Sequence, residues 1–556
     1  MRHISTSLRL LALMGLCTYP AVAQDTATTP HGVGAWGDVL YVTRYSTVEE
    51  GSVRLTMEPL SHALVYMRTN GEIRIANEGM PSMLLYSAAD HGLSSTTGMA
   101  FGPDGALYLV GMEVQGNYNV ATIKRGVMFP GGEWSRIWTT VARTVPYPRS
   151  NTNFDHNFNG IVVSPDGRSL YVNSGSRTDH GEVQDAGGAF PGLREVPLTS
   201  AIFRLPADGS DIELRNDEEW LRTNGYLYAD GVRNSFSLAF DATGALYATE
   251  NSGDRDDNDE INRIQEGHHY GFPWRMGMRD NPQQFPGYDT AADRLINRAS
   301  YAYTQGTFHN DPTFPPPPAG VTFTDPLSNV GPQGARYRDP ADGTIREGSR
   351  ENPVGTLTPH RSPLGLLFGG GDGAGRIGDF VLGWTSSRPT SGSLLVPFGE
   401  DEGEDLLLIT PDSGTTTIST QRVVSGFNQP IDMQSYGTSL YVMDFAGDRA
   451  IWRIGGLSVG VENEGTASAP FRFVGSYPNP FSSSTRFSLA MAQPGRLRLD
   501  VVNAMGEPVV SLFDGRLPEG ISPTFIFDGT GLPNGVYSIR ARGDDFAKVH
   551  RVVLMK

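Results

Sequence analysis

The sequence is poor in cysteine, since Cys17 is the only one among its 556 residues. It lies in the opening MRHISTSLRLLALMGLCTYPAVAQ, where two arginines precede an apolar run from Leu10 to Leu16 and an Ala-Val-Ala follows. This pattern predicts a secretory signal over residues 1–23. A lipid-anchored Cys17 is the alternative, although Leu16 stands where a small residue is expected. The mature chain then has no disulfide, so its stability must come from its core and from any bound metal.

Long apolar runs and excess positive charge are also missing. The run in the signal is too short to span a membrane, and no later segment is long enough. We therefore do not expect an integral membrane protein. Acidic residues outnumber basic ones by 61 to 44, which gives a net charge of −17. This charge disfavours nucleic acid and anionic membranes as partners and is compatible with cation binding.

Helical patterns are scarce, whereas the chain has 67 Gly and 38 Pro. This predicts many short strands joined by turns. A turn with Gly or Asp, followed by an apolar Leu-Tyr strand, recurs along the chain. The copies are WGDVLYVT (36–43), PDGALYLV (103–110), PDGRSLYV (165–172), ATGALYAT (242–249) and YGTSLYVM (436–443).

The spacing of these copies indicates the repeating unit. The leucines at positions 40, 107, 170 and 246 lie 67, 63 and 76 residues apart, which suits one four-stranded sheet with long loops. The 194 residues before Leu440 leave room for two more sheets, and GRIGDFVLGW (375–384) supplies a strand pair there. Radial repetition predicts an all-β fold, a β-propeller of six or seven blades. The Pro-, Asn- and Gly-rich stretch Gln283–Pro353 should form a long loop over one face, ordered or partly disordered.

A second domain follows the repeats. After the polar stretch VGVENEGTASAP (459–470), the chain contains SYPNPF (476–481), VVNAMGE (501–507) and LPNGVY (532–537). Alternating strands and turns predict a small β-sandwich. The block resembles the C-terminal sorting domain of the type IX secretion system of Bacteroidetes-like bacteria. That resemblance implies that this machinery exports the chain through the periplasm; a fibronectin-like binding module is the alternative.

The expected organisation is therefore a signal peptide (1–23), a propeller (24–456), a linker (457–470) and a sorting domain (471–556). The resulting location would be secreted or cell-surface.

The stretch GVRNSFSLAFDATGALYATENSGDRDDNDEINRIQEGHHYGFPW (231–274) is unusually polar for part of a blade. Gly231 permits an uncommon turn before Arg233, and Arg presents a planar fork to carboxylate or phosphate oxygens. From Glu250 to Glu260 there are six carboxylates and one arginine. Hard oxygen ligands in such number suit Ca²⁺. A solvated acidic loop beside a structural Arg is the alternative.

This stretch resembles the glucose/sorbosone dehydrogenase family, soluble quinoproteins that bind pyrroloquinoline quinone (PQQ). The family's GxRNPxGLAF, DEIN and YGWP motifs correspond to Arg233-Asn234, Asp259 to Asn262 and Tyr270 to Pro273. FDHNFNGIVVSPDGRSLYVNSGS (154–176) likewise resembles its DHxxxxLxxGPDxxLYxxxG, and TPHRSPLG (358–365) its HSAPLGL.

The resemblance implies six blades and the oxidation of a sugar or other alcohol, with an unspecified electron acceptor. It implies PQQ and Ca²⁺ as cofactors, with His156 as the general base and Arg233 polarising the quinone. PQQ carries three carboxylates, whose burial requires cations. The implied cofactor contacts are Arg233, Asn234, Arg388, His360 (or Arg361) and Gln429. The implied metal ligands are Glu260, Tyr270, Asp259 and Glu250.

Two departures from the family pattern weaken parts of this interpretation. Gln429 stands where the family has an arginine, so it can donate a hydrogen bond but brings no charge to PQQ. Ser176 stands where glucose-oxidising members have an aspartate, which weakens glucose as the substrate. Two other functions are therefore kept: a non-catalytic cell-surface propeller that binds a glycan or a protein, and a Ca²⁺-dependent lactonase-type hydrolase on the same fold.

Overall fold

The computed structural model divides the chain into two compact units, Met1–Leu457 and Ser458–Lys556. The residues that it describes are 29–37, 39–129, 134–331, 333–369, 377–386, 403–411, 416–457, 471–477, 481, 483–491, 494–503, 507–517, 523–543, 547–554 and 556.

Six sheets of three or more strands form the described part of the first unit. In chain order the first three are β3(Ser52–Met57) to β6(Met80–Tyr86), β7(Thr96–Phe101) to β10(Arg136–Thr144), and β12(Phe158–Val163), β13(Ser169–Ser174), β14(Ala201–Pro206) and β16(Leu227–Asp230). The others are β17(Ser237–Phe240) to β19(Glu260–Ile264), β25(Pro363–Phe368) to β28(Thr417–Ser425), and β29(Pro430–Tyr436) to β31(Ala450–Gly455).

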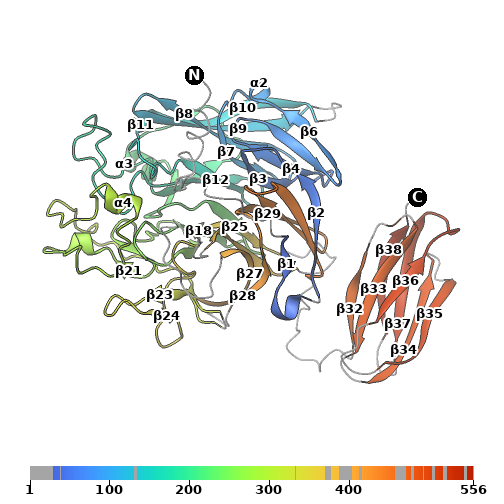
Figure 1. Ribbon diagram of the computed structural model, residues 1–556. Helices are drawn as coiled ribbons and strands as arrows, with labels where there is room; N and C mark the ends of the chain where they lie inside the picture. Colours follow the sequence, from blue (N-terminus) through green and yellow to red (C-terminus); the bar gives the residue numbers. More distant parts are fainter. Residues whose placement is uncertain are drawn as a thin grey trace, which may run out of the picture. The chain divides into compact units, whose positions relative to one another are not determined.

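The first strands of these sheets form a closed ring. β3 contacts β7, β7 contacts β12, and the series continues through β17, β25 and β29 back to β3. The sheets radiate from this ring in Figure 1. The predicted all-β fold is thus confirmed, and the number of propeller blades is six.

The ring is closed by strands from both ends of the propeller. β2(Tyr41–Thr47) pairs antiparallel with β31, from Tyr41 opposite Gly455 to Thr47 opposite Ala450. The repeat copy WGDVLYVT therefore leads into the outer strand of blade six, and its assignment to the same repeat position as the others was wrong. The other four copies are second strands of their blades, β8(Leu107–Gln115), β13, β18(Leu246–Glu250) and β30(Ser439–Asp444).

The Leu-Tyr strands are apolar on both faces because each blade packs between two neighbours. In β8, Leu107 and Leu109 join a core cluster shared with blade one. Tyr108 and Val110 point the other way and join the cluster shared with blade three. Side chains that alternate along a strand thus fill two interblade cores.

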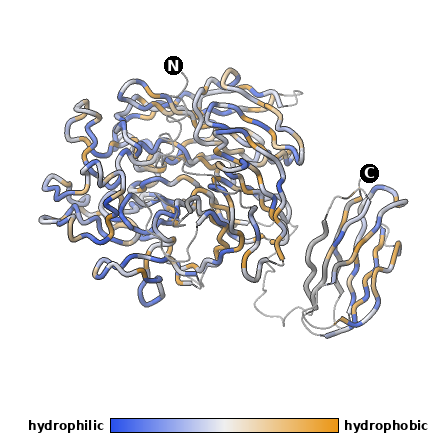
Figure 2. The backbone as a smooth tube through the Cα atoms, viewed as in Figure 1, coloured by the Kyte–Doolittle hydropathy of each residue, from blue (hydrophilic) through white to orange (hydrophobic). Residues whose placement is uncertain are grey.

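The stretch Gln283–Pro353 lies over the loops that follow β18. It contains α4(Tyr301–Thr304) and the hairpin of β23(Arg336–Arg338) and β24(Ile345–Glu347). Figure 2 shows this region, near α4, β21(Arg279–Asp280) and β23 of Figure 1, in mostly hydrophilic colours. Ion pairs and a small apolar cluster both hold it in place: Asp293 lies 2.9 Å from Arg255, Arg338 lies 2.8 Å from Asp256, and Ala302 and Phe308 pack with Phe154.

The second unit is a small β-sandwich. One sheet contains β32(Phe471–Tyr477), β33(Ser484–Met491) and β36(Thr524–Asp528), and the other β34(Gly495–Val502), β35(Pro508–Leu517), β37(Gly535–Arg542) and β38(Ala547–Leu554). Its core includes Phe481, Leu499, Phe527 and Ile539. Across the described parts of both units, no helix has the length and apolar character needed to cross a membrane.

Candidate functional site

His156 lies two residues before β12, at the end of the propeller ring where the long loops gather. It is buried, and its Nδ1 lies 3.2 Å from the Ser176 hydroxyl and 3.3 Å from the Ser176 carbonyl. That hydroxyl donates to the Thr178 carbonyl at 2.7 Å. Since both oxygens act as acceptors toward the ring, Nδ1 carries the proton and Nε2 is the basic nitrogen.

Burial, and then the charge of Arg233, lower the pKa of His156 to about 3. The imidazole is therefore neutral at physiological pH. A glycine lets the two segments approach: a Cβ at Gly175 would lie 2.3 Å from the His156 Cβ and 3.2 Å from the Arg233 carbonyl oxygen. His156 and Arg233 thus belong to one packed cluster, as the sequence predicted.

Arg233 is anchored by carbonyl and carboxylate oxygens. Gly231 has φ of +70° and a Cβ there would clash with the His269 ring, so the turn before Arg233 requires glycine. The buried guanidinium donates from Nε to the Asp179 carbonyl at 2.8 Å and from Nη2 to its carboxylate at 3.0 Å. Nη1 donates to the Asn251 carbonyl at 3.2 Å. Arg233 is therefore a buried cation with a fixed orientation.

Asp179 is a central residue that the sequence motifs did not identify. Its carboxylate accepts from Arg233, from the backbone N–H of Asp254 and from His180, whose Nδ1 lies 2.8 Å away. Burial alone would raise the pKa of Asp179, but His180 and Arg233 outweigh it, so the pKa is lowered. One indication was available in the sequence. Ser176 stands where the family has an aspartate, and Asp179 is an acidic residue three positions later.

His180 connects this cluster to the stretch Gln283–Pro353. Its ring stacks on Phe308 with centroids 4.1 Å apart and planes 8° apart. Although burial lowers the pKa of His180, Glu182 and Asp179 raise it more, so the net shift is upward. The described side chains of this corner, including Arg255, Phe272 and Asn281, enclose a cavity of about 20 Å³, enough for one water molecule.

Glu250 and Glu260 face each other across β18 and β19. The Asn262 amide donates to both, at 3.3 Å and 2.8 Å, and Glu260 also accepts from the Gly277 N–H at 2.7 Å. Burial raises the pKa of Glu260 to about 7, and burial together with Glu260 raises that of Glu250 well above its usual value. Two adjacent carboxyls in one buried place are a chemical fit for a cation.

The other two predicted metal ligands do not join this pair. Asp259 precedes Glu260, so its side chain points to the other face of the strand, where it accepts from the Ser252 and Ser362 N–H groups, both at 2.7 Å. The Tyr270 hydroxyl donates to the Arg263 carbonyl at 2.6 Å and accepts from the Gln265 N–H at 2.8 Å. The side chains of Asp259 and Tyr270 are therefore bonded to other protein groups and do not face Glu250 and Glu260. Among the described residues, no three His, Cys, Asp or Glu side chains converge as a metal site.

The remaining predicted cofactor contacts are placed as follows. Asn234 accepts from the Asn159 amide at 2.9 Å, beside the His156 segment. His360 binds Asp256 at 2.9 Å rather than Arg233 or His156, and its neighbour Arg361 pairs with Asp405. The Gln429 carbonyl accepts from the Phe445 N–H at 3.0 Å. Arg388 lies outside the described residues.

The donor set around Arg233 suits an anionic, oxygen-rich ligand. Arg233 supplies a buried cation, and the nearby Ser235 hydroxyl, which can donate, is buried without a hydrogen-bond partner among the described residues. Buried polar atoms of this kind are uncommon and are often satisfied by a ligand or ion. A carboxylate ligand would compete with Asp179 for the guanidinium.

This region of the chain matches the model of a known protein family. The family model for Glucose / Sorbosone dehydrogenase matches residues 54–314, which include His156, Asp179, Arg233 and Glu260. No curated protein matches the chain. Over this range, the chain is similar to sugar dehydrogenases.

Several solved structures are also similar. The soluble aldose sugar dehydrogenase of Escherichia coli in its apo form has 15% identity and a TM-score of 0.48, covering 75% of this chain and 99% of that one. The PQQ-bound aldose sugar dehydrogenase of Streptomyces coelicolor has 17% identity and a TM-score of 0.43, covering 75% and 98%. The PQQ domain of pyranose dehydrogenase from Coprinopsis cinerea has 11% identity and a TM-score of 0.47, covering 78% and 99%.

Proposed function

We propose that the propeller is a PQQ-dependent oxidoreductase that oxidises a sugar or another alcohol. The observation that carries this proposal is the cluster of a neutral, buried histidine and a fixed buried arginine within the range of the family match. When bound, PQQ would supply a quinone able to accept the carbon-bound hydrogen together with its two electrons, as a hydride.

In this mechanism the chain provides a base and an oriented cation. His156 takes the hydroxyl proton on Nε2, because Nδ1–H is held by Ser176. The imidazole is neutral before reaction, so the Nε2 lone pair is available to that proton, although a pKa of about 3 makes His156 a weak base in the ligand-free chain. Arg233 would hold and polarise the quinone, and Asp179 keeps the guanidinium oriented.

Ca²⁺ belongs to the same proposal, next to Glu250 and Glu260. A cation there would relieve the repulsion between two buried carboxylates. The side-chain oxygen of Asn262, which has no hydrogen-bond partner within the described part of the chain, is a further ligand atom of the type that Ca²⁺ prefers. Glu250 also accepts a hydrogen bond from the backbone N–H of Arg233. A metal bound to Glu250 would therefore stabilise the backbone at Arg233.

We also propose that the chain is delivered to the cell surface or beyond, on the basis of its signal-like N-terminus and the YPNPF and LPNGVY segments. The sandwich of the second unit would be the element that the type IX machinery binds.

Reconstitution tests the enzymatic proposal. Purified protein is mixed with PQQ and Ca²⁺, and dye reduction is followed over a panel of aldoses and simple alcohols. His91→Ala is a matched control, because His91 is also buried and has a lowered pKa but contacts the Gly71 carbonyl at 2.8 Å, in blade one. Dye reduction that needs PQQ and survives His91→Ala supports the proposal.

Failure to bind PQQ would instead favour a glycan- or protein-binding propeller. Gln429 is consistent with this alternative, because it brings no positive charge to the carboxylates of PQQ. Lactone hydrolysis that needs Ca²⁺ but no quinone would favour the hydrolase.

A further inference from the structure

Arg54 is a buried cation at the centre of the propeller ring. It lies in β3 of blade one and is 5% exposed. Its Nε donates to the Thr97 carbonyl of blade two at 3.0 Å, and its Nη2 donates to the Phe236 carbonyl at 3.0 Å. Phe236 directly precedes β17 of blade four, which stands opposite β3 in the ring of first strands. The Arg54 side chain therefore reaches across the ring.

The Phe236 ring occupies the same central space. The guanidinium carbon of Arg54 lies 3.8 Å from the centroid of this ring, close enough for a cation–π contact. Phe236 also belongs to a core cluster that contains Leu55 of blade one, Leu364 of blade five and Ile431 of blade six. Arg54 and Phe236 together thus connect blades on opposite sides of the propeller.

A cavity of about 330 Å³ borders this contact on the side away from His156. Its lining comes from the first strands of all six blades and includes Arg54 and Asp432. In blade three the cavity touches the last three residues of β12, whereas His156 precedes the first residue of that strand. Arg54 therefore lines the cavity while it bonds to the segment that leads back to Arg233.

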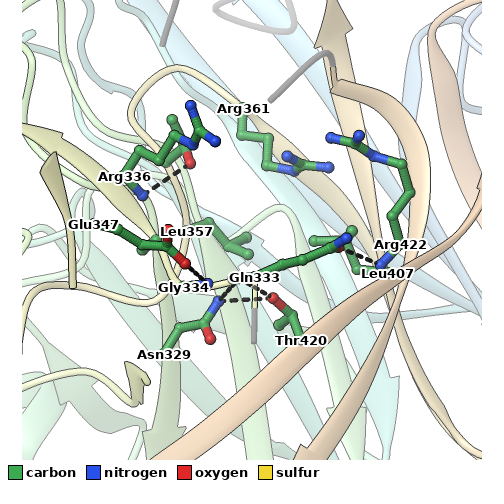
Figure 3. A pocket seen from close by; sticks show the side chains of 12 residues that line it. Asn329, Gln333, Gly334, Arg336, Glu347, Leu357, Arg361, Leu407, Thr420 and Arg422 are labelled. Atoms are coloured by element: carbon green, nitrogen blue, oxygen red, sulfur yellow. Dashed lines mark hydrogen bonds between the residues drawn. The ribbon is translucent and has the colours of Figure 1, made fainter. Parts of the chain in front are cut away.

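The bonding of Arg54 differs from that of the arginines in another polar cavity. That cavity, of about 240 Å³, is shown in Figure 3, where Arg361 and Arg422 are labelled. Both of these arginines pair with the buried Asp405 carboxylate. Arg54 bonds instead to backbone oxygens and, among the described residues, forms no ion pair. Burial lowers its pKa to about 10 against the opposing charge of Asp432, so Arg54 stays protonated at neutral pH.

The segment that Arg54 holds is the turn Arg233–Phe236. Within it, the Phe236 N–H donates to the Asn234 carbonyl at 2.9 Å. The Arg233 carbonyl accepts from the Ser176 N–H at 2.7 Å, next to the His156 ring contact. A shift of the Phe236 carbonyl would therefore displace the backbone that carries the Arg233 and Asn234 side chains.

We propose that Arg54 is a positioning residue for the site formed by His156 and Arg233. It fixes the turn Arg233–Phe236 from across the ring and so keeps the side chains of Arg233 and Asn234 aimed at a bound ligand. This inference rests on the proposed function in taking that ligand to be PQQ. Arg54 acts through Phe236 and is not itself a catalytic residue. Misplacing a binding group by about 1 Å can cost roughly a hundredfold in rate.

Hydrogen–deuterium exchange of the ligand-free full chain is the first test. Mass spectrometry of peptides that cover 233–236 should show exchange about tenfold faster in Arg54→Ala, because the turn loses its charge-assisted bond. Arg136→Ala is the matched control. Arg136 also donates to two backbone carbonyls, those of Gly105 and Gly126, both at 2.7 Å, and lies 5.4 Å from the Phe101 ring centroid. It belongs to β10 and should leave exchange of the turn unchanged.

Titration with PQQ is the second test. Arg54→Ala should weaken PQQ binding about tenfold or more, and Arg136→Ala should change it less than about twofold. Millimolar guanidinium chloride should restore part of the affinity of Arg54→Ala, since the ion can enter the 330 Å³ cavity and replace the lost group. Sodium chloride at the same concentration should not.

Arg54→Lys separates position from charge. Lysine keeps the positive charge, but one ammonium group does not reproduce the planar fork that bonds both carbonyls. We therefore expect faster exchange of the turn and weaker PQQ binding in this variant too. Circular dichroism shows whether each variant folds, and Arg54→Lys decides if Arg54→Ala does not. Wild-type exchange and affinity in Arg54→Lys would overturn the proposal, because charge alone would then suffice.

The two tests also separate this inference from the proposed function. If the wild type binds no PQQ, the proposed function fails, and exchange of the turn alone decides whether Arg54 holds it. If the wild type binds PQQ, unchanged exchange or unchanged affinity in Arg54→Ala overturns the positioning role and leaves the proposed function standing. Equal acceleration of exchange in Arg54→Ala and Arg136→Ala would overturn it as well, since any buried arginine would then have the same effect.

Discussion

His156 and Arg233 lie in the same cluster, but their bonding suits them to different tasks. His156 has one ring nitrogen bonded to Ser176 and, among the described residues, no ion pair, so its other nitrogen is open to a proton. Arg233 donates to three protein oxygens from its side chain and cannot lose its proton at ordinary pH. Substitution of each residue should therefore affect a different quantity.

Replacing His156 by alanine should lower turnover by about two to four orders of magnitude, the usual range for losing a general base. Affinity for PQQ should change little, because the cofactor's carboxylates need cations rather than an imidazole. Dye-reduction rates give the first quantity, and titration of the protein with PQQ gives the second. Arg233→Ala should show the reverse order, with weakened PQQ binding first. If His156→Ala retains full activity, the base is another residue.

The pKa values of two buried histidines give a test that needs no cofactor. His156 has a pKa near 3 in the folded chain but about 6.5 when unfolded. Between these values the unfolded chain binds a proton that the folded chain does not, so this group destabilises the fold as pH falls below about 6.5. His180 has a raised pKa, so its contribution is present below about 6.5 and is lost as pH rises through the higher folded value.

We expect the NMR signals of the His156 ring to show no titration above pH 5 and those of His180 to titrate above its unfolded value. In urea unfolding, His156→Gln should reduce the loss of stability on the acid side. A His156 signal that titrates near neutral pH would contradict its buried, unpaired state.

Part of the candidate site could be predicted from residue types and order. The GxRN and DH motifs identified two segments that do pack together, because both stand before first strands of adjacent blades. Asp179 could not be identified in this way, since its bond to Arg233 joins loops 54 residues apart. The motif also did not show where the Asp259 side chain points. It lies away from Glu250 and Glu260, because neighbouring residues on a strand point to opposite faces.

At the level of single elements, the β18–β19 pair is where a metal effect should appear. Adding Ca²⁺ should raise the melting temperature, because a cation removes the repulsion between Glu250 and Glu260 and binds only the folded chain. Glu260→Gln should abolish most of this effect and reduce the sensitivity to chelator. Thermal melts with chelator, Ca²⁺ and Mg²⁺ provide the measurement. The control is Glu266→Gln, a substitution of a surface residue that pairs with Arg204. Equal melting with and without chelator would remove the metal from the proposal.

Strand β2 is the second element with a testable role. It is the only described strand from before the first blade that joins blade six, through six paired positions with β31. A chain that starts at residue 49 should lose this closure and melt well below a chain that starts at residue 24. The reason is that β31 then becomes an exposed edge and the outer side of blade six loses its cover. Equal melting temperatures would show that the ring does not need β2.

The repeats explain why the architecture could be predicted better than its details. A Leu-Tyr strand between two interblade cores leaves a recognisable pattern, so second strands were found in blades two, three, four and six. Blade one carries ALVYMR (63–68) in β4(Leu64–Arg68) instead, without the Leu-Tyr pair, and was not recognised. The path of Gln283–Pro353 was also beyond prediction, because it is fixed by scattered polar contacts such as Arg338 with Asp256.

At the scale of the whole molecule, the two units have separate hydrophobic cores. The propeller cores contain residues up to Leu457, and the core of the sandwich contains residues from Phe481 onward. Units with separate cores generally fold independently. The chain can therefore be cut between them without removing a buried residue of either core.

Removing residues 471–556 should leave the melting temperature of the propeller within a few degrees of its value in the full chain, because the truncation removes no core residue of the propeller. The same truncation should stop delivery to the cell surface and leave the protein in the periplasm, because on the proposal above the sandwich carries the sorting segments. Scanning calorimetry measures the first effect, and fractionation with surface protease treatment measures the second. As the control, alanine substitution of the exposed Ile526 keeps the sandwich and should preserve delivery. Normal surface delivery of the truncated chain would show that the second unit is a binding module and not a sorting domain.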